Sequence, residues 1–277
     1  MTYRLASRFS RQRVGFRSHL PLSDDQIRQH APSIFSEEKH GSRSTRYTCI
    51  PTIDVVQALR REGFEPFEVA QTKVRDEGKR EHAKHMLRLR HADQVNAAEA
   101  NEIILLNSHD GTSSYQMLAG VFRFACANGM VCGDVVEDLR IPHRGDVVGE
   151  VVNGAFRVLD QFGQVVESRE EMKGLQLNQE EQAIFARAAL SLKYDTETAA
   201  APVTEDQVLS TRRLDDRGGD LWRTFNRVQE NLVRGGLDAR TTTGKRTRTR
   251  PVQGIDTNVK LNRALWTLAE EMRRLKG

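Results

Sequence analysis

The sequence lacks any long apolar run. No stretch of its 277 residues approaches the roughly 18 consecutive apolar residues of a membrane-spanning helix, so we expect no membrane span. The first 20 residues are rich in arginine but lack the apolar segment of a secretory signal. Their composition permits a mitochondrial-type presequence, although a basic arm is the simpler interpretation.

Cysteine is also scarce. The chain has three cysteines, Cys49, Cys126 and Cys132, and they are widely spaced. An odd number at such spacing fits a reducing, cytoplasmic setting better than a disulfide framework. Cys126 and Cys132 lie among apolar residues and are predicted to be small core side chains. No base stands at a spacing typical of a catalytic thiol.

Positive charge is concentrated in two blocks. Residues 1–22 contain five arginines, residues 239–250 contain four arginines and one lysine, and neither block contains an acidic residue. Because the formal net charge of the chain is +4, the rest of it carries −6. Such blocks repel themselves, stay extended and commonly bind nucleic acid. A merely solvated loop is the alternative interpretation.

The middle of the sequence predicts a small core. Thr52 is a plausible N-cap and Gly63 a plausible stop for its first helix, and Asn128-Gly129 ends its last. In the apolar run at 101–110, odd-numbered and even-numbered positions are both apolar: Ile103 and Leu105 on one side, Ile104 and Leu106 on the other. This pattern is typical of a strand that is covered on both faces. The predicted order is α-β-β-β-α, with a helix at 52–62, strands at 64–75, 82–91 and 101–110 in a three-stranded antiparallel sheet, and a helix at 113–128.

The second predicted strand alternates between two kinds of side chain. One face holds Lys84, Met86, Arg88 and Arg90, and the other holds His85, Leu87, Leu89 and His91. We therefore expect one basic outer face and one mostly apolar inner face. More basic residues of the same hairpin extend the basic face: Lys73, Arg75, Lys79 and Arg80.

Residues 106–116, LNSHDGTSSYQ, are the most chemically rich stretch of the chain. His109 and Asp110 are adjacent on a strand end and point apart, which argues against a Ser-His-Asp triad. Histidines 82, 85, 91 and 109 show no metal-ligand spacing, so no metal site is expected. A phosphate site is the better interpretation: Thr112 or Ser113 would cap a helix whose free N–H groups, with Ser114, face an anion. A capped helix without a ligand is the alternative.

The second half has helical spacing almost throughout. Asn178 with Glu181 and Thr204 with Gln207 have the form of capping boxes. The fold class is therefore α+β, with the core followed by a mostly helical C-terminal half. The expected divisions are a basic arm at 1–50, the core at 51–135, a helical extension at 136–200, and C-terminal helices at 201–277 around a basic loop at 239–250.

Two segments resemble a known family. EIILLNSHDGTSSYQMLAGVFRFACANGMVCGD, at 102–134, and GIDTNVKLNRALWTLAEEM, at 254–272, look like the phage and plasmid-like proteins grouped as domain-of-unknown-function family 932. The resemblance runs from about residue 48 to residue 277. It implies a bacterial or mobile-element origin and a bacterial cytoplasmic location, but no activity.

The order of elements resembles a second group, the single-strand annealing proteins, which include the Red beta and RecT-like recombinases. In them a sheet and the helix that follows form a groove for single-stranded DNA. By that resemblance the contacts here are Lys73, Arg75, Lys84, Arg88, Arg90 and Arg123. The full predicted nucleic-acid set adds Lys79 and Arg80 of the same hairpin, Thr112, Ser113 and Ser114, and the loop residues Lys245, Arg246, Arg248 and Arg250.

The leading hypothesis is a mobile-element protein that binds and anneals single-stranded DNA in recombination. It would use no cofactor and no covalent chemistry, and it would assemble into a homo-oligomeric ring or filament. The alternative is a non-enzymatic interaction protein that targets a host defence or replication factor. A metal-dependent nuclease ranks last, because no carboxylate cluster has a suggestive spacing.

Overall fold

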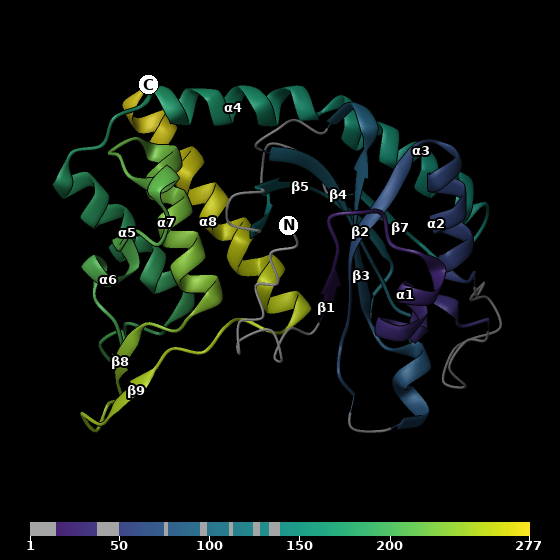
Figure 1. The fold of residues 1–277 in the computed structure, drawn as a ribbon, viewed down its shortest axis with the longest axis horizontal. Helices are drawn as coiled ribbons and strands as arrows, with labels where there is room; N and C mark the ends of the chain where they lie inside the picture. Colours follow the sequence, from purple (N-terminus) through teal and green to yellow (C-terminus); the bar gives the residue numbers. More distant parts are fainter. Residues whose placement is uncertain are drawn as a thin grey trace, which may run out of the picture.

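A curled antiparallel sheet lies at the centre of the structure (Figure 1). The computed structural model describes residues 15–37, 50–74, 77–94, 99–110, 113–123, 128–132 and 139–277. The sheet has seven strands in the order β1-β2-β3-β4-β5-β6, and β7 also pairs with β5. The strands are β1 (Gly15–Arg17), β2 (Phe64–Gln71), β3 (His85–His91), β4 (Glu99–Asn107), β5 (Tyr115–Arg123), β6 (Asn128–Val131) and β7 (Leu139–Ile141).

The fold is thus a mixture of helices and an antiparallel sheet, as predicted, but three strands was too few. The helix expected at 113–128 is wrong, because Tyr115–Arg123 forms strand β5. All nine residues of β4 are buried, so both of its edges need hydrogen-bonding partners, and β5 supplies one of them. β5 is apolar on both faces, and such a run cannot be assigned to helix or strand by periodicity alone. Asn128-Gly129, expected to stop that helix, begins β6.

Helices cover the face of the sheet that carries Leu87 and Leu89. They are α1 (Asp24–His30), α2 (Thr52–Arg61) and α3 (Val147–Asp160). The expected helix at 52–62 is confirmed, and Gly63 follows it with φ +85°. Thr52, however, is the first residue of α2 rather than its cap, and Pro51 takes the cap position.

A helical lobe lies beside the sheet, and α4 (Phe162–Gly174) runs across from one to the other (Figure 1). The lobe contains α5 (Gln179–Lys193), α6 (Glu205–Leu209), α7 (Leu221–Arg234) and α8 (Ile255–Lys276). Short 3-10 turns lie at η2 (Pro32–Phe35), η3 (Glu77–His82), η4 (Ala92–Gln94) and η5 (Leu214–Asp216). The capping boxes at Asn178 and Thr204 are confirmed. Among the described helices, none has the length and apolar character needed to cross a bilayer.

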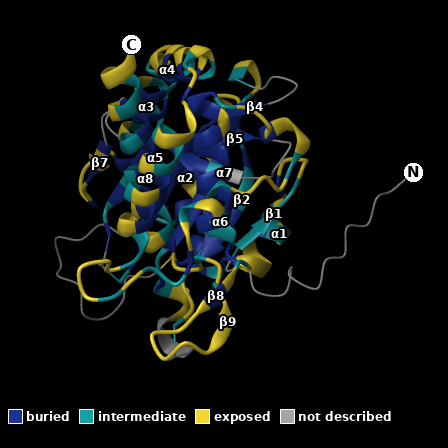
Figure 2. Cartoon of the chain, turned by 90° about the vertical axis from the view of Figure 1, so that its left-hand side faces the viewer, coloured by how far each residue is buried: buried dark blue, intermediate teal, exposed yellow. Residues whose placement is uncertain are grey.

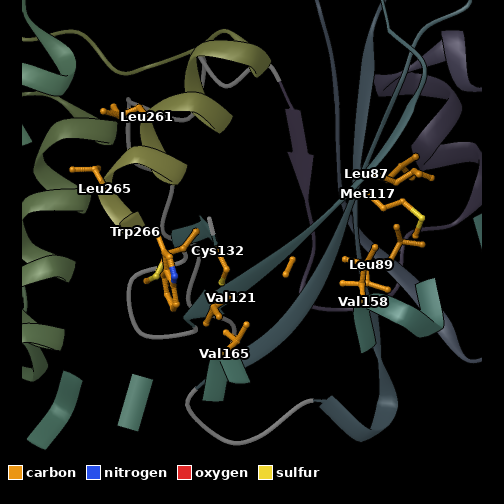
Figure 3. Close-up of a cluster of buried hydrophobic side chains, with 14 of the residues drawn as sticks. Leu87, Leu89, Met117, Val121, Cys132, Val158, Val165, Leu261, Leu265 and Trp266 are labelled. Carbon is orange, nitrogen blue, oxygen red and sulfur yellow. The ribbon is translucent and has the colours of Figure 1, made fainter. Parts of the chain in front are cut away.

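One continuous apolar core joins the sheet to the helical lobe. Val121 of β5, Cys132 after β6 and Val165 of α4 lie beside Trp266 of α8 (Figure 3). Leu89 belongs to the same core and lies on the same face of the sheet as Val121. The opposite face of the sheet carries a smaller apolar cluster that α8 covers with Ile255. The two lobes therefore share buried surface.

The segment expected to be a basic loop at 239–250 is instead a β-hairpin. β8 (Asp238–Arg240) pairs with β9 (Arg246–Arg248), and the hairpin projects from the helical lobe (Figure 1). Gly244 has φ +79°, and its N–H donates to the carbonyl of Thr241 at 2.8 Å. A three-residue loop that ends in a left-handed glycine is a standard hairpin connection, which explains why this charged segment folds back on itself.

Gly235 should be essential for the hairpin's position. It ends α7 with φ +63° and ψ −150°, a region that is essentially restricted to glycine, and an added Cβ would lie 2.6 Å from the carbonyl carbon of Arg250. We expect Gly235→Ala to lower the free energy of unfolding by about 3 kcal/mol. Gly236→Ala is the matched control: its φ is +79° but nothing lies within 4 Å, so it should cost only about 1 kcal/mol. Urea unfolding that gives equal losses for both variants would contradict the steric argument.

Candidate nucleic-acid interface

The strand β3 was expected to present a basic outer face, and the structure buries that face. Arg88 is 2% exposed and Arg90 is 3% exposed. Both donate to the same carboxylate: Arg88 Nη1 lies 3.0 Å from Oε2 of Glu102, and Arg90 Nε lies 2.9 Å from Oε1. The strand alternates as predicted, but its basic face is also buried. The guanidinium groups of Arg88 and Arg90 are therefore not available to a phosphate in this fold.

Further groups complete this buried charge network. Arg17 of β1 pairs with Glu68 of β2, and Arg88 Nε lies 3.7 Å from Glu68 Oε2. The guanidinium of Arg90 lies 4.2 Å from the ring centre of Phe122, a cation–π contact. Burial lowers the pKa of Arg90, while the Glu102 carboxylate opposes that shift. The network holds five charged side chains against the sheet and leaves them little freedom.

Two other predicted contacts join the sheet to the helical lobe. Arg123, at the end of β5, is buried and pairs with the buried carboxylate of Asp216 in η5. Lys84 Nζ lies 2.8 Å from Asp256 Oδ1 in the first turn of α8. Both cations therefore act as links between parts of this chain.

The remaining predicted residues of the core separate into exposed and undescribed ones. Lys73 and Arg80 are exposed. Arg75 and Thr112, together with the side chain of Lys79, lie outside the described residues.

The phosphate site expected at Ser113 and Ser114 has no helix behind it. Ser113 is buried, its N–H donates to Ser108 Oγ at 2.8 Å, and its own hydroxyl donates to the carbonyl of Ser114. These bonds join the end of β4 to the start of β5. Because a strand follows, no row of free helix N–H groups faces an anion, and the predicted cradle is not formed.

A buried polar cluster lies at the end of the sheet next to α2. Thr52 Oγ1 is its centre: it lies 2.9 Å from His85 Nε2, 3.3 Å from His109 Nε2 and 3.2 Å from the Tyr115 hydroxyl. Asn107 Nδ2 donates to it at 3.0 Å. A hydroxyl has one proton and two acceptor positions, so at most three of these four contacts are hydrogen bonds at any one time.

Burial keeps these imidazoles neutral. It lowers the pKa of His85 to about 3 and the pKa of His109 to about 4, and in each case a neighbouring imidazole adds to the shift. Burial also lowers the pKa of His143, which packs 5.0 Å from the ring of Tyr115. The cluster resembles a nucleophile next to a base, but Thr52 and His85 are both fully buried, so no substrate reaches them in this fold.

Metal and thiol chemistry find little support in the part of the chain that the structure describes. No group of three His, Cys, Asp or Glu side chains there is arranged to hold a metal ion. Cys132 is a free, buried thiol, and burial raises its pKa, so it is held as the unreactive protonated form. It is a small core side chain, as predicted. Cys49 and Cys126 lie outside the described residues.

The β8–β9 hairpin keeps its basic side chains at the surface. Every residue from Arg240 to Arg248 is exposed, and so is Arg250 (Figure 2). Arg248 Nε lies 3.1 Å from Asp238 Oδ1, with both side chains mostly in solvent. A salt bridge so exposed contributes little and is easily exchanged for another anion.

The register of the hairpin places Arg240 directly opposite Arg246. Like charges at opposed positions destabilise a strand pair, and an anion bound between them removes that repulsion. The hairpin is nevertheless formed, with Arg240 N–H donating to the carbonyl of Pro202 at 3.1 Å and Gln207 Nε2 donating to Asp238 at 2.7 Å. The scaffold therefore places two arginines opposite each other at the surface, and guanidinium groups are well suited to bind a phosphate.

Sequence reasoning missed the acidic partners. Glu102 lies between Asn101 and Ile103 in β4, at the start of an apolar run, and a buried glutamate in a strand signals a buried cation nearby. Gly129 was read as a helix stop, whereas it makes room for Arg88: a Cβ there would lie 2.7 Å from the guanidinium carbon. Asp216 carried no sequence signal, and Thr52 was interpreted only as a helix cap, because their partners are distant along the chain.

The Glu102 carboxylate should be costly to neutralise. Glu102→Gln leaves two buried guanidiniums without their shared anion, and we expect the free energy of unfolding to fall by about 3–5 kcal/mol. Glu271→Gln is the control, because Glu271 pairs with Arg274 at the surface and should cost less than about 1 kcal/mol. Denaturant unfolding measures both variants. If Glu102→Gln lowers the free energy of unfolding by less than about 1 kcal/mol, the buried network contributes little to stability.

Acid should destabilise the fold through His85 and His109. Both imidazoles have lowered pKa values in the folded chain but titrate near 6.5 when unfolded. Stability is therefore complete above about pH 6.5, and as the pH falls towards 4 the unfolded chain binds more protons. The free energy of unfolding should fall by up to about 1.4 kcal/mol per pH unit for each group. Urea titrations at several pH values test this: His85→Gln should flatten the dependence, whereas His19→Gln, at an exposed position, should not.

Comparison with known proteins places the chain in a family. Residues 39–266 match the family model Domain of unknown function (DUF932). The chain is 52% identical over 269 residues to UPF0380 protein YafZ of Escherichia coli (strain K12), and the alignment covers 97% of both proteins. UPF0380 protein YfjQ of the same strain is also 52% identical over 269 residues, with the same coverage. No solved structure matches the chain. The chain therefore belongs to the DUF932 family, as the segments at 102–134 and 254–272 predict.

Proposed function

We propose that this chain is a DNA-binding protein and that the β8–β9 hairpin is its contact surface. The observation that carries the proposal is the exposed pair Arg240 and Arg246, held opposite each other on a formed hairpin. Between Asp238 and Arg250 the hairpin carries five cations against one carboxylate. A protein surface of this kind binds the phosphate backbone.

Binding would proceed without a chemical step. Each Lys or Arg that meets a phosphate releases condensed counterions, so affinity falls linearly with salt on logarithmic axes. Thr241 and Thr247 add exposed hydroxyls that donate to phosphate oxygens. The function requires no cofactor, and the buried cluster around Thr52 supports the fold rather than the ligand.

Single-strand annealing, with its ring or filament, remains a prediction from resemblance. It assigned the groove to six cations, and three of them, Arg88, Arg90 and Arg123, are buried and ion-paired in the fold. The exposed cations of the described chain thus favour the hairpin as the place where DNA binds. Bacterial mobile-element origin and a cytoplasmic location stand as parts of the same proposal.

Charge reversal at the tip of the hairpin tests the function. Lys245→Glu with Arg246→Glu should abolish binding of a labelled 30-nucleotide DNA, offered both as a single strand and as a duplex. With about four phosphates contacted, the parent chain should lose about 100-fold in affinity between 50 and 200 mM salt. Fluorescence anisotropy measures both quantities. Arg144→Glu with Arg217→Glu is the matched control: both side chains are exposed, lie elsewhere and should leave binding intact.

The outcomes separate the two classes of function. Salt-sensitive binding that only the tip variant loses supports DNA binding. No binding of either DNA form by the parent chain would overturn the proposal. Capture of a specific host protein in nuclease-treated extract, without DNA, would then favour the interaction-protein alternative.

A further inference from the structure

The hairpin offers charge and hydroxyl groups but nothing on which a base can stack. Residues 237–250 contain no aromatic side chain. Proteins that hold single strands without sequence preference combine a positive groove with aromatic rings, and each stacked base contributes about 1–3 kcal/mol. A ligand of this hairpin is therefore held through its phosphates and groove edges.

The two helices that flank the hairpin, α7 and α8, present no exposed ring. The aromatic side chains of the adjacent helices, Trp222, Phe225 and Trp266, are at most 3% exposed. Within the described residues, the exposed large hydrophobic side chains are all leucine or isoleucine: Leu20, Ile184, Leu192, Leu214 and Leu275. The described surface is thus poorly suited to single strands, whose exposed bases need partners.

The dimensions of the hairpin match a duplex. Asp238 to Thr241 spans about 10 Å at ~3.3 Å per residue. The major groove of B-form DNA is about 12 Å wide and about 8.5 Å deep, and it admits a two-stranded β-ribbon. The tip of the hairpin is thus long enough to reach the floor of the groove while Arg250, nearer its base, stays close to the backbone.

The paired arginines also favour a duplex. Duplex DNA carries one phosphate per ~1.7 Å of axis, twice the density of a single strand. Arg240 and Arg246 lie on the same side of the ribbon, where closely spaced phosphates or a guanine edge can take both guanidiniums. Duplex RNA fits less well, because the major groove of A-form RNA is too deep and narrow for side chains to enter.

We propose that the β8–β9 hairpin inserts into the major groove of B-form duplex DNA, with Arg240 and Arg246 as its principal contacts. The inference rests on the proposed DNA binding and specifies the form of the ligand. It reverses the single-strand preference expected from the sequence.

Three labelled ligands of one sequence test the form of the ligand: a 20-base-pair DNA duplex, each of its single strands, and the corresponding RNA duplex. The full chain should bind the DNA duplex at least 10-fold more tightly than either single strand or the RNA. Arg240→Ala with Arg246→Ala should reduce the slope of log affinity against log salt by about 2, since each phosphate contributes about 0.9. Arg144→Ala with Arg217→Ala should leave the slope unchanged.

The groove is tested on the same DNA duplex. Prior methylation of guanine N7, which lies in the major groove, should weaken binding, and a minor-groove ligand such as netropsin should not compete. Competition by netropsin with no effect of methylation would overturn insertion into the major groove. Equal or tighter binding of the single strand or the RNA would overturn the duplex assignment while leaving nucleic-acid binding in place. Failure to bind any of the ligands would overturn the proposed function itself.

Discussion

The shared carboxylate of Glu102 is the interaction on which the sheet depends. It lies in the central strand, is fully buried, and accepts from Arg88 and Arg90 of the neighbouring strand. A strand that is covered on both faces would ordinarily be apolar throughout. Here one face of the sheet is apolar, and the other buries the ion pairs of Glu102 with Arg88 and Arg90. Because these hydrogen bonds are directional, the second face fixes the strand register more strictly than apolar contacts alone would. Buried ion pairs of this kind are weak evidence for stability, but they strongly disfavour any pairing that separates them.

The same logic explains how the helical lobe is attached. Arg123, at the end of β5, forms an ion pair with Asp216, which lies 93 residues later in the chain. Trp266 and Cys132 continue the apolar core across the same boundary. Charge and burial thus act together at one junction. A chain cut before residue 216 would lose the Asp216 carboxylate that pairs with the buried Arg123 guanidinium, and that loss disfavours such a fragment.

Local patterns in the sequence predicted those parts of the fold that local forces decide. The helix at 52–61, the capped helices after Asn178 and Thr204, and the alternation of β3 follow from spacing and capping chemistry. The strand β5 was mistaken for a helix because its period is masked by apolar residues on both faces. Residues 115–123 form a strand because β4, already paired with β3, needs a hydrogen-bonding partner at its other edge. That need arises from the whole sheet and cannot be seen in the sequence of β5 itself.

The candidate site was predicted in part for the same reason. Basic residues are visible in a sequence, but their partners are not, so Arg88, Arg90 and Arg123 looked available when they are paired. The block at 239–250 differed because it contains no acid at all. Neutralisation from within the block was therefore excluded, and its cations remain at the surface although Asp238, just outside it, pairs with Arg248. A cation's accessibility is predicted best where its sequence neighbours cannot neutralise it.

The hairpin leaves and rejoins the helical lobe at almost the same place. The N–H of Val252 donates to the carbonyl of Val233 at 2.9 Å, so the two ends of the intervening segment are adjacent. The closure cost of such a segment depends only weakly on its length. The cost of chain closure therefore places little constraint on the length of the segment between α7 and α8. Relatives with the same core are free to differ in the length and charge of this segment.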